Sequence, residues 1–147
     1  MNIISYISER LSFLGVVAFC LIGASLLGWK FIGSNSGPNS INVTLPELSG
    51  PAKSGKVAFD ANCAICHGAN ASGSDQGPPL IHNIYNPGHH ADMSFVMAAK
   101  RGVRGHHWQF GNMPSQPQVD DASISLIIRY VREVQVANGI VYQAHKM

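Results

Sequence analysis

The stretch Cys63-Ala64-Ile65-Cys66-His67 carries the strongest signal in this 147-residue chain. Its two thiols are separated by two residues, and a histidine directly follows the second thiol. Residues three positions apart on a helix lie on one face, so both thiols can add to the vinyl groups of one porphyrin while the imidazole lies under the iron. This C-x-x-C-H pattern is the covalent attachment site of c-type haem. We therefore predict one haem c, attached through Cys63 and Cys66.

Two other uses of paired cysteines fit the sequence less well. A thioredoxin-like dithiol belongs to a βαβ unit, and the sequence has no convincing alternating strand. A zinc site needs a second pair of ligands, and the third cysteine, Cys20, lies in an apolar N-terminal stretch. The bulky Phe19 before Cys20 also argues against a lipoprotein site, which leaves Cys20 as an inert thiol.

Met113 is the leading candidate for the second axial ligand of the iron. It lies in Gly111-Asn112-Met113-Pro114, 46 residues after His67. The proline stops helix formation there, so a loop can close over the far face of the haem. Methionine opposite histidine raises the reduction potential of a haem. His106 and His107 are the alternative ligands.

These motifs resemble those of class I cytochromes c over about residues 51–138. The resemblance is carried by the C-x-x-C-H run, by Gly77-Pro78-Pro79-Leu80, by the Met113 segment and by the C-terminal helix. It implies that His67 is the proximal iron ligand and Met113 the distal one. It also implies that the Pro78 carbonyl accepts the His67 Nδ1 proton, and that Leu80 packs against the porphyrin.

The resemblance further implies that the first and last helices of the domain cross at a small residue beside aromatic rings. These residues are Gly55 and Phe59 on one side and Tyr130 on the other. From its position between the histidines and the Met113 segment, Trp108 is expected to pack along the haem edge. Its indole N–H would then reach a haem propionate.

The remaining sequence predicts a small all-α domain, with about three main helices and long loops around one covalent haem. The first helix runs from Ala52 to Cys66, and a loop rich in Gly and Pro follows over 68–87. Asp92 or Ser94 caps a second helix that ends near Arg101, and Met93 and Met97 on it have the spacing of core filler. The third helix begins at Asp120-Asp121 and ends at Asn138-Gly139. Its apolar residues repeat at intervals of three and four: Ile124, Ile127, Ile128, Val131 and Val134.

The N-terminal region predicts a membrane anchor. Residues 11–29 are nineteen consecutive residues without a charge, and a helix of that length spans about 29 Å, close to the hydrocarbon core of about 30 Å. A cleaved signal peptide is the alternative, although its apolar region is usually shorter. The predicted organisation is an anchor over 1–32, a flexible linker rich in Gly, Ser, Asn and Pro over 33–50, and a haem domain over 51–147.

Composition narrows the possible functions. The chain is 46% hydrophobic and 12% charged, which argues against intrinsic disorder. Its formal net charge of +2 is too small for a nucleic-acid-binding protein. A local basic cluster, formed by Lys100, Arg101 and Arg104, can be either a solvated helix end or a rim that steers an acidic redox partner.

The extra histidines are the least explained feature of the sequence. The adjacent pairs His89-His90 and His106-His107 could form a copper site together with Met113. Adjacent histidines on a strand or loop tend to point apart, however. We therefore expect them to lie at the surface or to contact haem propionates.

The resemblance implies a membrane-tethered bacterial cytochrome c that transfers single electrons. Thioethers form outside the cytoplasm, so the haem domain is expected in the periplasm, on the inner membrane. Its expected partners are a quinol:cytochrome c oxidoreductase and a terminal oxidase or periplasmic reductase. Two alternatives remain: a haem enzyme or ligand sensor with an open sixth position, and a fixed subunit of a larger redox complex.

Overall fold

The computed structural model describes residues 15, 17–19, 23 and 39–144 of the chain. The chain divides into two units, Met1–Ser34 and Asn35–Met147, and the second contains every element named below. Among the described residues, no helix has the length and hydrophobicity needed to cross a bilayer. Most of the membrane helix predicted over 11–29 lies outside the described residues.

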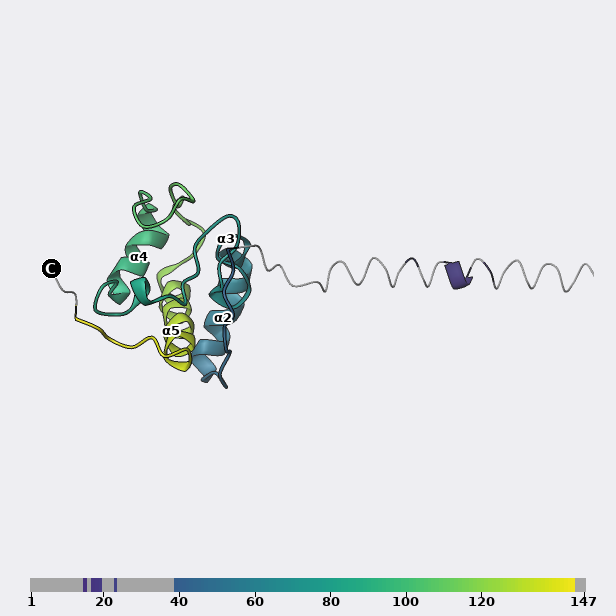
Figure 1. Cartoon of the computed structure of the whole chain (residues 1–147), viewed down its shortest axis with the longest axis horizontal. Coiled ribbons are helices and arrows are strands. Elements are labelled where there is room, and N and C mark those ends of the chain that lie inside the picture. The colour runs from purple at the N-terminus through teal and green to yellow at the C-terminus, as the bar shows by residue number, and fades with distance from the viewer. Residues whose placement is uncertain (1–14, 16, 20–22, 24–38, 145–147) are drawn as a thin grey trace, which may run out of the picture. The chain divides into compact units, whose positions relative to one another are not determined.

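Residues 39–144 form a helical domain (Figure 1). Its helices are α2 (Gly50–Asn62), α3 (Ala64–His67), η1 (Ala69–Ala71), η2 (Asn83–Tyr85), α4 (Asp92–Arg101) and α5 (Asp121–Ala137), where η denotes a 3-10 helix. An isolated antiparallel bridge between Val103 and Met113 is the β-pairing found in this part of the chain. The predicted all-α class is therefore confirmed for the described domain.

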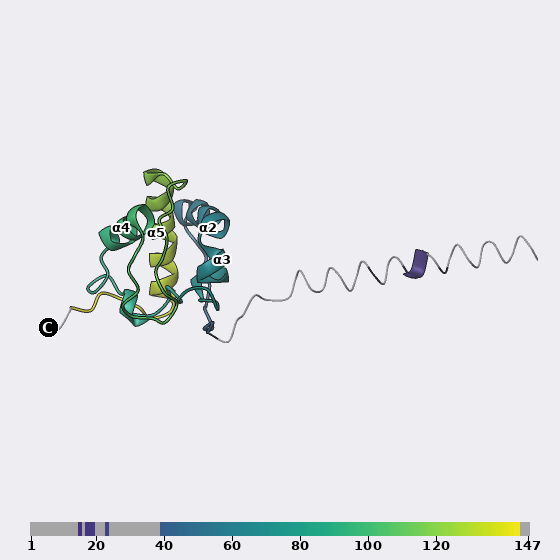
Figure 2. The same cartoon turned by 90° about the horizontal axis from the view of Figure 1, so that it is seen from above.

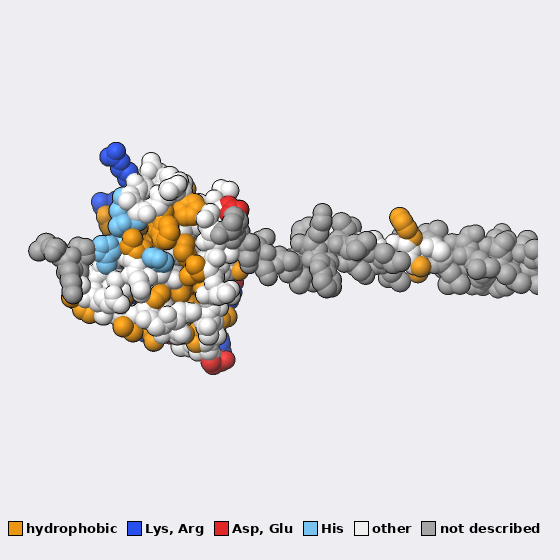
Figure 3. Space-filling view, viewed as in Figure 1, with side chains coloured by type: hydrophobic (Ala, Val, Ile, Leu, Met, Phe, Trp, Pro, Cys, Tyr) orange, Lys and Arg blue, Asp and Glu red, His pale blue; other side chains and the backbone are white. Residues whose placement is uncertain are grey.

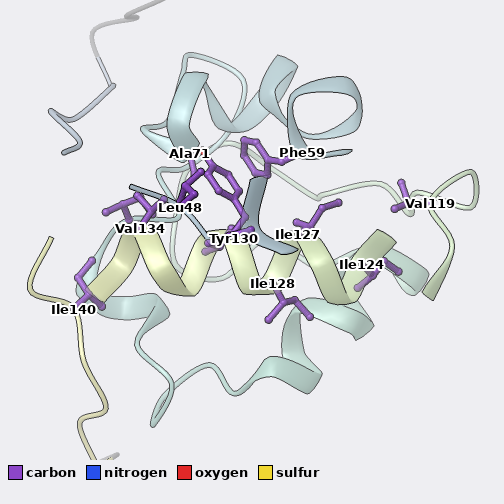
Figure 4. Close-up of a cluster of buried hydrophobic side chains, with 13 residues drawn as sticks. Leu48, Phe59, Ala71, Val119, Ile124, Ile127, Ile128, Tyr130, Val134 and Ile140 are labelled. Carbon is purple, nitrogen blue, oxygen red and sulfur yellow. The ribbon is translucent and has the colours of Figure 1, made fainter. Parts of the chain in front are cut away.

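Helix α5 forms the centre of the domain, with α2 along one side and α4 along the other (Figure 2). It begins where predicted, because the Asp120 carboxylate accepts a hydrogen bond from the Ser123 N–H at 2.7 Å. It ends one residue before Asn138, with Gly139 at a φ of 77°. The predicted apolar repeat is its buried face, and Tyr130 is buried with it (Figure 4). Gln135 is also buried.

The crossing of α2 and α5 depends on a glycine. A Cβ atom at Gly55 would lie 1.9 Å from the Leu126 carbonyl oxygen and 3.0 Å from the Tyr130 Cβ. Beside this crossing, the Phe59 and Tyr130 rings pack with their centroids 5.4 Å apart (Figure 4). The expected contact of Gly55 and Phe59 with Tyr130 is confirmed.

The first predicted helix is interrupted at Cys63. The expected range was 52–66, but α2 ends at Asn62 and α3 begins at Ala64 because Cys63 has a φ of −118°. Helix α2 also starts earlier than expected. The Ser49 hydroxyl caps it by accepting from the Ala52 N–H, and the Glu133 carboxylate of α5 accepts from the Ser49 hydroxyl at 2.7 Å.

Helix α4 has the predicted end at Gly102, whose φ is 75°. The predicted cap is wrong: the N-cap residue is Ala91, and the Ser94 hydroxyl donates to the Ala91 carbonyl instead of receiving an N–H. Met93 and Met97 are 65% and 36% exposed, so they do not fill a core. The helix contacts the core through Phe95, Val96 and Ala99.

The segment before α2 lies against the domain, although a flexible linker was predicted over 33–50. The Ile41 N–H donates to Ser72, and Thr44 exchanges two hydrogen bonds of 2.8 and 2.9 Å with the Asn138 side chain. Leu48 is buried in the core. Composition alone did not predict this packing, because the residues that bind the segment, Ser72 and Asn138, lie in distant parts of the chain.

Gly55→Ala tests the helix crossing. We expect the free energy of unfolding of the haem-loaded protein to fall by about 2 kcal/mol or more, because the added methyl group meets backbone rather than a movable side chain. Denaturant unfolding followed by circular dichroism measures the change. Gly50→Ala is the matched control, since nothing lies within 4 Å of its added Cβ, and it should change stability by under about 0.5 kcal/mol. Equal effects of the two substitutions would contradict the crossing.

Candidate haem-binding site

A cavity of about 600 Å³ lies between α4, α5, the end of α2 and the loops that join them. Its volume falls within the range of about 300–1,000 Å³ typical of ligand and cofactor sites. Most of the side chains around it are hydrophobic, so it suits a large, flat, apolar group. Six of the seven predicted site residues line it: Cys63, His67, Pro78, Leu80, Trp108 and Met113.

His67 has the geometry of a metal-ligating histidine. It is 9% exposed, and its Nδ1 lies 2.9 Å from the Pro78 carbonyl oxygen. A carbonyl can only accept, so Nδ1 carries the proton and Nε2 keeps its lone pair. Burial lowers the pKa of this imidazole, and the Pro78 hydrogen bond opposes that shift only in part. His67 is therefore a neutral imidazole with a fixed tautomer, the form that can bind a metal.

The backbone after His67 turns sharply to bring Pro78 beneath it. Gly68 follows at a φ of 73°, and a Cβ there would lie 2.1 Å from the Gly73 carbonyl oxygen. The Gly73 N–H then donates to the His67 carbonyl at 2.7 Å. Only glycine adopts this conformation in so little space.

Both cysteines of the motif are half-buried, and neither is in a disulfide. Cys63 lines the main cavity, and both line an adjoining hollow of about 130 Å³ beside the Met113 segment. Burial, with a smaller effect of Cys66, raises the pKa of the Cys63 thiol to about 11. The attacking thiol of a reactive dithiol has a lowered pKa, so Cys63 lacks the electrostatics of a thioredoxin-like site.

Met113 reaches the cavity from the opposite loop. The Val103–Met113 bridge fixes its backbone through hydrogen bonds of 2.9 and 3.0 Å. Gly102 allows this approach, because a Cβ there would lie 2.5 Å from the Met113 carbonyl oxygen. The structure thus brings His67 and Met113 to one cavity from distant parts of the chain.

The profile of the family described as Cytochrome c matches residues 52–135. The chain belongs to the cytochrome c family. The match extends from α2 into α5 and includes the C-x-x-C-H motif, which supports the predicted class I c-type cytochrome. No significant match was found among curated proteins or among solved structures.

Membership in the cytochrome c family implies covalently attached haem c, and the residues of this cavity fit that group. The apolar lining matches a porphyrin, and Cys63 and Cys66 have the spacing for two thioethers. His67, buried and neutral, has one nitrogen left for the iron. Haem attachment would also join the side chains of Cys63 and Cys66 to a large apolar group, which would enlarge the hydrophobic core of this small domain.

Leu80 and Trp108 line the cavity of this cytochrome c as expected. Leu80 is held by its backbone: its N–H donates to Ala71 at 2.9 Å, and its carbonyl accepts from the Gln135 side chain at 2.9 Å. The Trp108 indole N–H, which we expected to reach a propionate, donates to the Tyr85 hydroxyl at 3.0 Å. Tyr85 also lines the cavity. It was not predicted as a site residue, because it belongs to no recognised sequence motif.

The extra histidines of the cytochrome c gather on one face, beside exposed hydrophobic side chains (Figure 3). His90, His106 and His107 line the cavity. The expectation that adjacent histidines point apart is wrong here, since the ring centroids of His89 and His90 are 4.7 Å apart and those of His106 and His107 are 4.0 Å apart. His89 and His90 lie in a turn and the bend after it, and His106 and His107 lie in irregular backbone with a bend at His107; neither segment alternates side chains as a strand does.

Cys63→Ala combined with Cys66→Ala should abolish covalent haem, whereas either substitution alone should leave at most one thioether. The measurement is the mass of the denatured protein matured in a bacterial periplasm, together with haem staining after denaturing electrophoresis. Cys20→Ser is the control and should keep both thioethers. Haem that survives denaturation of the double variant would show attachment elsewhere.

Proposed function

We propose that this cytochrome c is a one-electron carrier in which His67 and Met113 are the two axial ligands of a low-spin haem iron. Family membership supports a haem-based electron carrier. The observation that carries the ligand assignment is that His67 and Met113 line the same cavity, each held by hydrogen bonds of its own loop.

Bound haem supplies the redox chemistry, by taking up and releasing one electron at its iron. The protein supplies rigidity. The Pro78 carbonyl holds the His67 ring, and the Val103 backbone holds Met113, so neither ligand has to move when the charge on the site changes. The apolar lining also excludes water, whose reorientation would slow electron transfer.

The ligand assignment is tested by Met113→Ala in the haem-loaded protein. We expect the native protein, ferric and ferrous, to have low-spin spectra and to bind carbon monoxide slowly. Met113→Ala should become high-spin and bind carbon monoxide at least tenfold faster, because the sixth position is then open. The measurements are visible absorption spectra and stopped-flow mixing with carbon monoxide.

The control for this experiment is Met97→Ala. Met97 lines the same cavity but lies on α4, so its removal should leave the low-spin spectrum unchanged. Rapid carbon monoxide binding by the native protein would instead favour the enzyme or sensor alternative. His106 and His107, which line the cavity, would then be the candidate acid–base groups.

We also propose that residues 1–32 anchor this carrier in a bacterial inner membrane, with the haem domain in the periplasm. The support is the uncharged run over 11–29 and the need of c-type haem attachment for an extracytoplasmic compartment. A tether holds a carrier near its partners at an effective concentration on the order of millimolar. The proposed partners are a quinol:cytochrome c oxidoreductase and a terminal oxidase or periplasmic reductase.

Charge near the cavity supports docking of an acidic partner. Lys100 is paired with Asp121, whereas the nearby Arg101 and Arg104 are exposed. Exposed guanidinium groups beside an apolar opening raise the rate of encounter with an acidic surface, and salt weakens that effect.

Replacing residues 1–32 with a cleavable periplasmic signal peptide tests the anchor. The full chain should be recovered in the membrane fraction and require detergent for release, whereas the replaced chain should be recovered in the periplasm with the same haem spectrum. Cell fractionation and haem staining measure both. A full chain released by osmotic shock without detergent would contradict the anchor.

A further inference from the structure

Four histidines from two separate loops meet at the mouth of the haem cavity. His89 and His90 precede α4, whereas His106 and His107 follow it. One ligand atom from each of His89, His90 and His107 lies within 4.8 Å of the others. The His90 and His107 ring centroids are 5.3 Å apart, and His106 packs against His107. Histidine side chains lie near one another on this face, among hydrophobic side chains (Figure 3), and we call His89, His90, His106 and His107 the histidine cluster.

The spacing is close to that of a bound transition metal. Two nitrogens bound to one ion at about 2.0–2.1 Å can be at most about 4.2 Å apart. Ligand atoms within 4.8 Å of one another therefore need only small side-chain rotations to share an ion.

The loop that carries His89 and His90 is held in place by buried polar side chains. Asn86 is 6% exposed, and its side-chain oxygen accepts from the Gly88 N–H at 2.9 Å and the His89 N–H at 3.3 Å. The Arg132 guanidinium of α5 donates to the His90 carbonyl at 2.5 Å and to the Tyr85 carbonyl at 2.7 Å. The first half of the histidine cluster is thus preorganised by the core of the domain.

Ring hydrogen bonds fix the tautomer of two histidines. His90 Nδ1 lies 2.6 Å from the Ile84 carbonyl oxygen, and His106 Nδ1 lies 2.9 Å from the Arg104 carbonyl oxygen. Each Nδ1 must therefore donate, which leaves Nε2 as a free ligand atom. A ligating histidine commonly donates its other N–H to a carbonyl in this way, and His67 does so beneath the haem.

The charge of the surroundings is compatible with a cation. Arg132, whose positive charge acts on His90, is paired with Asp92 through a contact of 2.8 Å. Desolvation, with the neighbouring imidazoles, lowers the pKa of His107. Desolvation is also the main reason that the pKa of His90 is lowered. Neutral imidazoles are the form that binds metals.

We propose that His89, His90 and His107 form a binding site for one divalent transition-metal ion at the mouth of the haem cavity, with Cu²⁺ the preferred ion. Imidazole ligands suit copper and zinc, and Cu²⁺ binds most tightly among the divalent first-row ions. His90 and His107 also line the haem cavity, so the ion adds positive charge beside the haem. A bound ion therefore raises the haem reduction potential, because it disfavours the more positive ferric state.

The binding test uses haem-loaded protein freed of metal with a chelator and titrated with Cu²⁺ alone. We expect one equivalent to bind, with nitrogen hyperfine structure in the electron paramagnetic resonance spectrum. His107→Gln and His89→Gln should each weaken binding at least tenfold. His82→Gln is the matched control. His82 is exposed, is not one of the three proposed ligands (His89, His90 and His107, the triad) and contacts Trp108. Its substitution should leave the Cu²⁺ affinity unchanged.

The potential test uses Zn²⁺, which has no redox chemistry of its own. Saturating Zn²⁺ should raise the haem potential of the native protein and of His82→Gln, but not that of His107→Gln. This result is independent of whether Met113 binds the iron, so failure of the metal site and failure of the proposed ligation are distinguishable.

Two results would overturn the proposal. One is haem-loaded protein that binds no Cu²⁺, which would mean that the imidazoles are committed to the haem carboxylates. The other is binding that survives both triad substitutions but is lost in His145→Gln, which would place the ion at the C-terminus. The haem absorption spectrum of each variant verifies that it is folded and loaded.

Discussion

The close approach of α2 to α5 at Gly55 is the constraint on which the rest of the domain depends. With no Cβ at this position, the helix backbones come close enough for Phe59 to pack on Tyr130. Helix α2 ends one turn beyond Phe59, at the break that places Cys63 and, at the end of α3, His67. The spacing between the two helices therefore sets where the haem-attachment motif lies relative to the core. The position of the haem-attachment motif at the end of α2 therefore depends on the contact that Gly55 makes in the middle of α2.

Helix α5 performs a second task through buried polar side chains. Gln135, fully buried, donates to the carbonyls of Leu80 and Tyr85. Arg132 reaches the same loop and lies 4.8 Å from the centre of the Phe95 ring of α4. The loop that contains η2 is thereby tied to α5. These bonds satisfy backbone carbonyls that would otherwise be buried without partners, and they give the cavity a rigid wall.

The sequence predicted the features that depend on neighbouring residues. The Asp120 cap, the apolar repeat of α5 and the glycine end of α4 are local signals, and each is where expected. The family resemblance added the Pro78 contact with His67. Two errors are local, the N-cap of α4 and the helix break at Cys63, and the others concern contacts between distant segments. The Trp108 partner, the packing of residues 41–48 and the meeting of two histidine pairs all depend on tertiary structure, which hydrophobic periodicity and composition do not encode.

The docking of the segment before α2 changes the mechanics of the proposed tether. Ile41, Thr44 and Leu48 are fixed to the domain, so the part of the predicted linker from 41 to 48 adds nothing to its reach. Eight extended residues would span about 26 Å, and the proposed tether is shorter by that length than the eighteen-residue linker predicted over 33–50. A membrane-anchored chain of this kind would search a thin layer above the bilayer. Its partners would have to present their redox centres within that layer.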